Sequence, residues 1–376
     1  MKGFCAMPNQ AIHKRYDYLD IAKAISIFLV LIGHTTANLD TPFFRLVLYT
    51  FHMPLFFMVS GIVMHTHPDC NYDWKHWRKF FRKNIFTLFV PYFIWALIYC
   101  RFNFANSARI LYGSWQTLTE AKTVTSLWFL PCLVLARTFM EFVLMLSKHF
   151  SKLNRHLYAA IVSIPAFCIG FLLPNLASGY PWCFDTAFIA LGFMLIGYSL
   201  KERLIALHSR KLWQITTLLA ISAALFVAII TMQGDKLPLI LMCAGKYGNI
   251  LYFLLEAFSA CSMVLLLSIV HTVLFVKRRD SRIRHFILWV GRNTKGILLL
   301  HKPFLQEIVV KHAVAFGLPM PNLFVAIACA AVTLPVCCVG IIVIKRFFPQ
   351  LFGTFPRLEK MLDEESFVYE DKIFRA

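Results

Sequence analysis

Residues 16–35 read YDYLDIAKAISIFLVLIGHT, an apolar stretch into which Asp20, Lys23 and His34 are set. The stretch is long enough to cross a bilayer as one helix. Lys23 and His34 are eleven residues apart, which is about three helical turns, roughly 16 Å, and places both side chains on nearly the same helix face. Ionisable groups inside a membrane helix are costly, so they indicate a functional site. Snorkelling of Lys23 to the interface and a bond from His34 to a neighbouring helix are the alternative explanation.

The composition of the whole chain predicts an integral membrane protein. Of the 376 residues, 59% are hydrophobic and only 15% are charged, which is typical of chains with many apolar spans. The net charge of +19 lies mainly in short loops between apolar segments. Membrane topology and anionic headgroups explain such loops better than nucleic acid does, and we find no nucleic-acid-binding motif.

The eleven cysteines are scattered and include no C-x-x-C pair. We interpret them as small buried hydrophobic residues. His and Cys residues show no standard zinc-ligand spacing, so we expect no metal site.

Ten apolar segments predict an all-α polytopic membrane protein with about ten transmembrane helices. Basic loops follow the second, fourth, sixth and eighth segments, and the positive-inside rule then places both termini in the cytoplasm. We expect a cytoplasmic N-terminal arm (1–17), one membrane domain (18–346) and a cytoplasmic C-terminal tail (347–376). The expected spans are 18–38, 43–65, 84–104, 126–147, 157–174, 184–200, 212–232, 250–276, 294–311 and 323–346.

Five segments stand out by sequence: YLDIAK (18–23), GHT (33–35), FHMPLFFMVSG (51–61), SLWFLP (126–131) and GRNTKGILLLHKP (291–303). In this order and spacing they resemble the acyltransferase-3 family of integral membrane O-acyltransferases, in particular its fucose 4-O-acetylase-like branch. The segments extend from the first expected span to the ninth, so the resemblance covers most of the chain. Much of the family has Arg where this chain has Lys23, which keeps the charge but not the planar fork of a guanidinium.

The resemblance implies transfer of an acyl group, expected to be acetyl, from acyl-CoA to a hydroxyl. The implied acceptor is a cell-surface carbohydrate or its lipid-linked precursor, and the implied location is a bacterial inner membrane. Acetyl-CoA is then a donor substrate, and we expect no permanently bound cofactor. A secondary transporter or flippase for a sugar or lipid-linked sugar is the alternative, because polar, broken membrane helices also line transport paths. The oligomeric state stays open.

His34 is the candidate catalytic residue. A hydroxyl becomes a good nucleophile only as its proton is removed, and a neutral imidazole suits that task. Whether His34 acts as a general base or as a transient acyl carrier stays open, since only the second route forms a covalent intermediate.

The expected donor site lies near the cytoplasmic end of the spans. We expect Lys23, Arg292 and Lys295 to bind anionic parts of the donor, although positive-inside basicity explains Arg292 and Lys295 equally well. Asp20 is expected to pair with Lys23 as a neighbour one helical turn away.

The expected substrate-binding residues are His52, Ser60, Trp128 and His301. For His52, a role in capping or in bridging to a headgroup is the alternative. Trp128 suits either a sugar-stacking platform or an aromatic-belt anchor. Ser60 lies next to Gly61, a pair that allows another helix or a ligand to approach closely.

Overall fold

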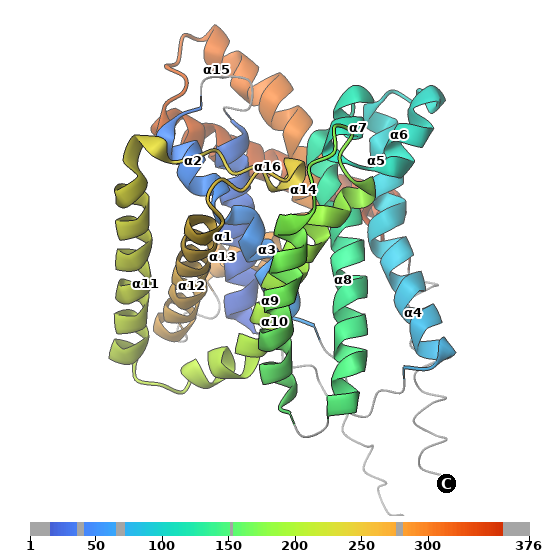
Figure 1. The fold of residues 1–376 in the computed structure, drawn as a ribbon. Coiled ribbons are helices and arrows are strands. Elements are labelled where there is room, and N and C mark those ends of the chain that lie inside the picture. The colour runs from blue at the N-terminus through green and yellow to red at the C-terminus, as the bar shows by residue number, and fades with distance from the viewer. Residues whose placement is uncertain (1–15, 36–40, 65–71, 151–152, 276–280, 356–376) are drawn as a thin grey trace, which may run out of the picture.

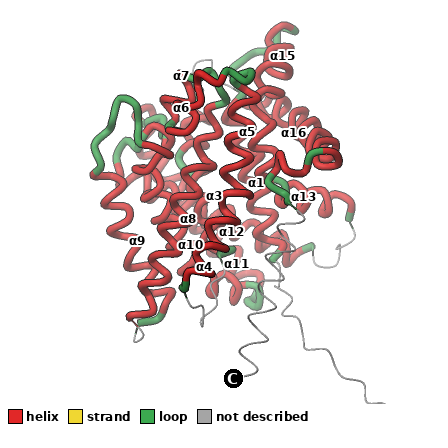
Figure 2. Tube along the Cα trace, turned by 90° about the vertical axis from the view of Figure 1, so that its right-hand side faces the viewer, coloured by secondary structure: helices red, strands yellow, loops and turns green. Residues whose placement is uncertain are grey.

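The computed structural model describes residues 16–35, 41–64, 72–150, 153–275 and 281–355. The regular structure of these residues is helical (Figures 1 and 2), apart from one isolated bridge between Leu241 and Lys246. The α-helices are α1 (Asp17–His34), α2 (Phe43–Tyr49), α3 (His52–Ile62), α4 (Trp74–Asn84), α5 (Val90–Tyr99), α6 (Ser107–Tyr112), α7 (Trp115–Glu120), α8 (Phe129–Leu146), α9 (Arg155–Leu172), α10 (Phe184–Leu207), α11 (Leu212–Gln233), α12 (Ile250–Leu274), α13 (Arg282–Arg292), α14 (Thr294–Lys302), α15 (Lys311–Ala315) and α16 (Leu323–Phe347).

Shorter helical segments connect or extend these helices. Two are π-helical, η1 (Ile85–Phe89) and η9 (Pro303–Val310). The 3₁₀ segments are η2 (Phe104–Asn106), η3 (Thr125–Trp128), η4 (Ser147–Phe150), η5 (Pro181–Cys183), η6 (Gly234–Lys236), η7 (Met242–Ala244) and η10 (Pro349–Phe352).

Within the described residues, eight helical segments are long and apolar enough to cross a membrane. Each coincides with one expected span, the second to the eighth and the tenth, so the prediction of an all-α, multi-pass membrane protein is confirmed. The segments are Phe43–Ile62, Trp74–Tyr99, Thr125–Phe150, Arg155–Leu172, Pro181–Leu207, Leu212–Lys236, Ile250–Leu274 and Leu323–Phe347.

The other two expected spans, the first and the ninth, correspond to α1 and to α14 with its extension through η9 and α15. These are the two that contain His34 and His301, and α1 also includes Asp17, Asp20 and Lys23. The total of ten spans and the cytoplasmic location of the termini stay predictions. The expected N-terminal arm and C-terminal tail lie almost wholly outside the described residues.

The helix of the third expected span begins before the span itself. One continuous helix runs from Trp74 to Tyr99, so the basic aromatic stretch before residue 84 is helical and leads directly into the apolar span. The side chain of Asp73 fixes the start of this helix by accepting a hydrogen bond from the backbone N–H of His76 at 2.8 Å. Such an N-cap satisfies a donor that the first helical turn leaves open.

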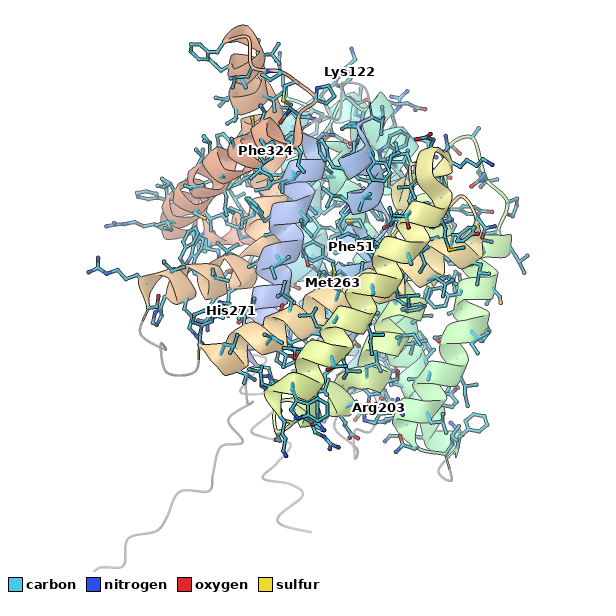
Figure 3. The ribbon with its side chains drawn as sticks, turned by 90° about the vertical axis from the view of Figure 1, so that its left-hand side faces the viewer. Phe51, Lys122, Arg203, Met263, His271 and Phe324 are labelled. Carbon is cyan, nitrogen blue, oxygen red and sulfur yellow. The ribbon has the colours of Figure 1, made fainter. Side chains whose placement is uncertain are left out.

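Helix α1 lies at the centre of the bundle (Figure 1), in contact with α3, α12, α13 and α16. Figure 3 places Phe51 inside the bundle, whereas Lys122 and Arg203 lie at its opposite ends. Arg203 belongs to the end that carries the basic connections expected on the cytoplasmic side. Lys122 belongs to the opposite end, which we call the outer end.

Glycines permit the closest helix crossings. A Cβ at Gly61 of α3 would lie 1.9 Å from the carbonyl oxygen of Met194 in α10. A Cβ at Gly197 of α10 would in turn lie 2.1 Å from the carbonyl oxygen of Met58. The close approach expected beside Ser60 is therefore confirmed, and its partner is a helix.

This crossing gives a stability prediction. Gly61→Ala forces the backbones of α3 and α10 apart, and we expect a loss of about 1–3 kcal/mol, typical of overpacked sites. The readout is the apparent thermal midpoint of the protein in lipid nanodiscs, which should fall by several degrees. Gly340→Ala is the matched control, because the nearest atom to its added Cβ is a flexible one, Leu300 Cδ1 at 3.3 Å. Equal midpoints for the two variants would contradict the prediction.

Candidate functional site

A cavity of about 330 Å³ lies beside the outer end of α1. Its volume is at the small end of the range for ligand pockets. Three of the predicted site residues, His34, His52 and Trp128, line it. Its described lining comprises Val30, His34, Arg45, Tyr49, His52, Met53, Trp115, Thr119, Thr125, Ser126, Trp128, Phe129, Ile240, Leu241, Met242, Cys243, Leu298 and Lys302.

His34 and His301 form a hydrogen-bonded pair at this cavity. The Nδ1 atom of His34 lies 3.1 Å from Nε2 of His301, and the ring centroids are 5.0 Å apart. His301 is fully buried on α14, directly behind His34. Two histidines that are 267 positions apart in the sequence therefore act as one unit.

The hydrogen bonds of His301 determine the tautomers of the pair. Its Nδ1 faces the backbone carbonyls of Leu298 at 2.8 Å and Ile297 at 3.2 Å. Carbonyl oxygens only accept, so Nδ1 of His301 carries a proton. In the neutral pair, Nε2 of His301 then accepts from the Nδ1–H of His34. The lone pair of His34 is left on Nε2, the ring atom available to a ligand in the cavity.

The rings of Tyr49 and His52 also line the cavity, next to that of His34. The ring centroids of His34 and Tyr49 are 6.4 Å apart, and those of Tyr49 and His52 are 4.8 Å apart. Regular helix is interrupted between α2 and α3. At this point Nδ1 of His52 donates a hydrogen bond to the backbone carbonyl of Leu48 at 2.7 Å. This contact supports the capping explanation for His52, and its place in the lining also leaves it accessible to a ligand.

Trp128 is buried and forms part of the cavity wall. An aromatic-belt anchor would face lipid headgroups, so the aromatic-belt alternative does not fit this position. An indole in a cavity wall offers a flat apolar face for packing against a ligand.

Two cations line the same cavity, Lys302 from α14 and Arg45 from α2. The Nζ of Lys302 donates to Oγ1 of Thr125 at 2.6 Å, and the guanidinium of Arg45 lies 5.0 Å from the ring centroid of Tyr49. Sequence reasoning missed both as site residues. Both are charged residues within or at the edge of an apolar segment, which is the sequence feature that could have indicated them. Lys302 also directly follows His301.

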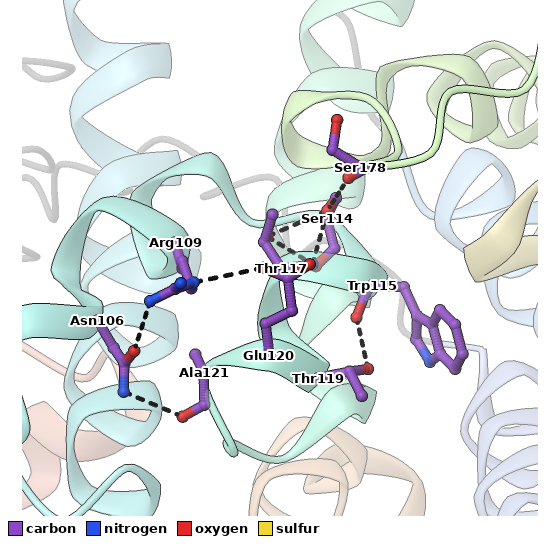
Figure 4. Close-up of polar contacts among 9 residues, drawn as sticks. All are labelled: Asn106, Arg109, Ser114, Trp115, Thr117, Thr119, Glu120, Ala121 and Ser178. Carbon is purple, nitrogen blue, oxygen red and sulfur yellow. Dashed lines mark hydrogen bonds and ion pairs between the residues drawn. The ribbon is translucent and has the colours of Figure 1, made fainter.

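A small helical cap, whose polar contacts are drawn in Figure 4, lies beside the cavity. It consists of η2, α6 and α7, and its Trp115 and Thr119 belong to the lining. The hydroxyl of Ser114 donates to the carbonyl of Ser178 at 2.6 Å and so joins the cap to the segment that precedes η5. Further bonds inside the cap connect Arg109 with Glu120, Arg109 with Asn106, Asn106 with Ala121 and Thr119 with Trp115.

A second polar cluster lies at the inner end of α1. The buried carboxylate of Asp20 contacts Lys23 Nζ at 2.7 Å and Arg292 Nε at 3.3 Å, so the expected pairing of Asp20 with Lys23 is confirmed. Lys295 donates to the backbone carbonyl of Thr87 at 2.8 Å. These groups hold α13 and α14 against α1 and include more cations than carboxylates.

The inner cluster and Ser60 lie outside the described lining of the cavity. Lys23 is about 16 Å from the level of His34 along the helix. The lining on α1 stops at Val30, and Ile27, one turn further towards Lys23, is fully buried. The described cavity therefore does not extend along α1 from His34 to Lys23. The hydroxyl of Ser60 donates to the carbonyl of Phe56 at 2.8 Å within its own helix.

Comparison with known proteins identifies one matching family. The model of acyltransferase family 3, described as an acyltransferase domain, matches residues 16–342. No curated protein and no solved structure matches the chain.

The cavity predicts the reactivity of individual cysteines. Cys243 lines it, whereas Cys132 and Cys261 are fully buried elsewhere. We expect the small neutral reagent methyl methanethiosulfonate to modify Cys243 in nanodisc-embedded protein and to leave Cys132 and Cys261 unmodified. Peptide mass spectrometry locates the adducts, and Cys243→Ser is the control. Equal labelling of all three thiols would show that the cavity is not the route of access.

Proposed function

The chain belongs to the acyltransferase-3 family, and from this premise we propose that it transfers an acyl group, expected to be acetyl, from acyl-CoA to a carbohydrate hydroxyl. The proposed acceptor is a cell-surface carbohydrate or its lipid-linked precursor, and the proposed location is the bacterial inner membrane. Family membership and the apolar helices together make the chain a multi-pass membrane acyltransferase. The observation that carries the finer proposal is the hydrogen bond between the buried His301 and His34, which lines the cavity.

His34 is the proposed general base. Its Nε2 accepts the proton of the acceptor hydroxyl as the hydroxyl oxygen attacks the carbonyl carbon of the thioester. The carbon–sulfur bond then breaks, and the thiolate takes the proton back from His34 to leave as free CoA. His301 holds His34 in the tautomer that this sequence of proton transfers requires. A route through an acyl group on Nε2 of His34 uses the same tautomer and adds one covalent intermediate.

Binding of the donor is assigned to the inner cluster. Its excess of cations around Asp20 suits phosphate groups, and Lys345 adds a further ammonium, 2.6 Å from Oδ1 of Asn293. From there the acyl arm has to cover the three turns of α1 that separate Lys23 from His34. Because Ile27 closes this part of α1, the proposal requires the neighbouring helices to move apart when the donor binds.

The first test measures release of free CoA thiol from acetyl-CoA by the protein in nanodiscs, with and without a pool of surface-polysaccharide precursors. We expect the pool to stimulate release. His34→Ala should lower the stimulated rate by about 10²- to 10⁴-fold, the usual contribution of a general base.

The outcomes separate the alternatives. Undiminished release by His34→Ala would remove His34 from the mechanism. Failure of the wild-type protein to bind acetyl-CoA or to release thiol would favour a transporter or flippase. An acetylated His34 peptide, trapped without acceptor, would replace the general-base route by the covalent one.

A second prediction concerns His301 as a positioning residue. His301→Phe removes the acceptor for the Nδ1–H of His34, and we expect kcat to fall by about 10²-fold. The loss of the tautomer-holding aspartate in serine proteases costs about 10⁴-fold, and we expect less from a neutral partner. His301→Gln should restore part of the rate, because its amide oxygen can accept the same proton. Equal rates for the Phe and Gln variants, with an unchanged pH–rate profile, would reduce His301 to a packing role.

A further inference from the structure

The charged side chains in the described lining of the outer cavity are cations. Lys302 and Arg45 line it, and no Asp or Glu is among the described lining residues. The carboxylate of Asp185 lines a separate hollow of about 10 Å³ that Cys243 also lines. The bond of Lys302 is to a neutral hydroxyl, that of Thr125.

An ammonium group in this position is expensive unless it serves a ligand. Charged groups within a membrane domain are usually paired with opposite charge or line a path for a polar substrate. A single hydroxyl at 2.6 Å uses one of the three donors of Lys302. The remaining donors suit a carboxylate or phosphate, which forms stronger bonds with a cation than a neutral group does.

The proposed reaction gives a second reason to expect an anionic ligand in the cavity. When His34 takes a proton it becomes a further cation in a cavity that already holds Lys302. In the serine protease triad an aspartate beside the histidine stabilises the imidazolium, but the partner of His34 is another histidine, His301, which carries no negative charge. A ligand that brings a negative charge into the cavity would supply the missing stabilisation.

We propose that Lys302 binds a carboxylate or phosphate group of the acceptor, so that the acceptor is an acidic carbohydrate. This inference rests on the proposed function and names its substrate class. The volume of about 330 Å³ suits one sugar unit with its charged substituent. The acceptor is favoured over the phosphates of the donor because the cavity lies about three helical turns from the inner cluster.

The experiment uses Cys243 as a reporter inside the cavity and does not depend on catalysis. The rate of its modification is measured in nanodiscs with an anionic and a cationic methanethiosulfonate, the sulfonatoethyl and trimethylammonioethyl reagents. We expect the anionic reagent to react faster, and we expect Lys302→Gln to lower the ratio of the two rates by about 10-fold, at the lower limit of electrostatic focusing in clefts. Lys311→Gln, which removes an exposed lysine of α15, should leave the ratio unchanged.

Added sugars that slow the modification of Cys243 identify which anionic group binds. Methyl β-D-glucuronide presents a ring carboxylate, glucose 1-phosphate presents a phosphate, and methyl β-D-glucoside is the neutral match. In the wild-type protein we expect at least one of the two anionic sugars to protect Cys243 at about 10-fold lower concentration than the glucoside. The anionic sugar that protects better identifies the group. Lys302→Gln should abolish the difference and Lys302→Arg should retain it.

Three results of the labelling experiment would overturn the inference. They are equal protection by all three sugars, a ratio of rates that Lys302→Gln leaves unchanged, and stronger protection by monomethyl succinate, which would move the anion to the acyl group. The sugar comparison on the wild-type protein decides the question even if Lys302→Gln does not fold. Because labelling needs no acyl transfer, this test can succeed when the thiol-release assay fails. Efficient acyl transfer to a neutral sugar, without protection by an acidic one, would overturn this inference alone.

Discussion

A polar side chain inside a membrane bundle has to find its partner within the protein, and α1 carries polar groups at both of its ends. At the inner end Asp20 binds Arg292, and at the outer end His34 binds His301. Both partners belong to α13 and α14, so one short segment of the chain fixes α1 at two levels. Gly291 makes this possible, because a Cβ there would lie 1.9 Å from the carbonyl oxygen of Asp20. The register of α1 against α13 and α14 therefore determines the geometry of the site.

Rigid and irregular elements have separate roles around the cavity. His34, His301 and Lys302 project from regular helix, which holds the orientation of side chains better than loops do. Tyr49 and His52 line the cavity from either side of the break between α2 and α3, while η3 and the cap contribute Trp128 and Trp115 to its lining. A π-helical segment begins directly after Lys302, and such segments are common beside functional sites. The acyl chemistry and the binding of an acidic acceptor would thus share one small space at the outer end.

Much of this organisation could be predicted from the sequence. The apolar segments and the alternation of basic loops gave the helical membrane class, since hydropathy and the positive-inside rule act locally along the chain. His34 was identified because an imidazole within an apolar span is costly. The helix of the third span starts before the expected span, because Asp73 caps a helix that runs through a basic stretch into the apolar segment. The aromatic-belt alternative for Trp128 was open until its burial was known, because a tryptophan at the end of a span looks the same in sequence whether it faces lipid or protein.

The sequence by itself determined the family, the helical membrane architecture and the residue types available for acyl transfer, because periodicity, hydropathy and short motifs depend on neighbours in the chain. Only the tertiary structure decided that His301 lies behind His34 and sets its tautomer, and that Lys302 and Arg45 share the cavity while Lys23, Arg292, Lys295 and Ser60 do not line it. Hydrogen bonds between side chains hundreds of positions apart depend on helix register and crossing. These are set by close packing at positions such as Gly61 and Gly291, and linear spacing does not specify them.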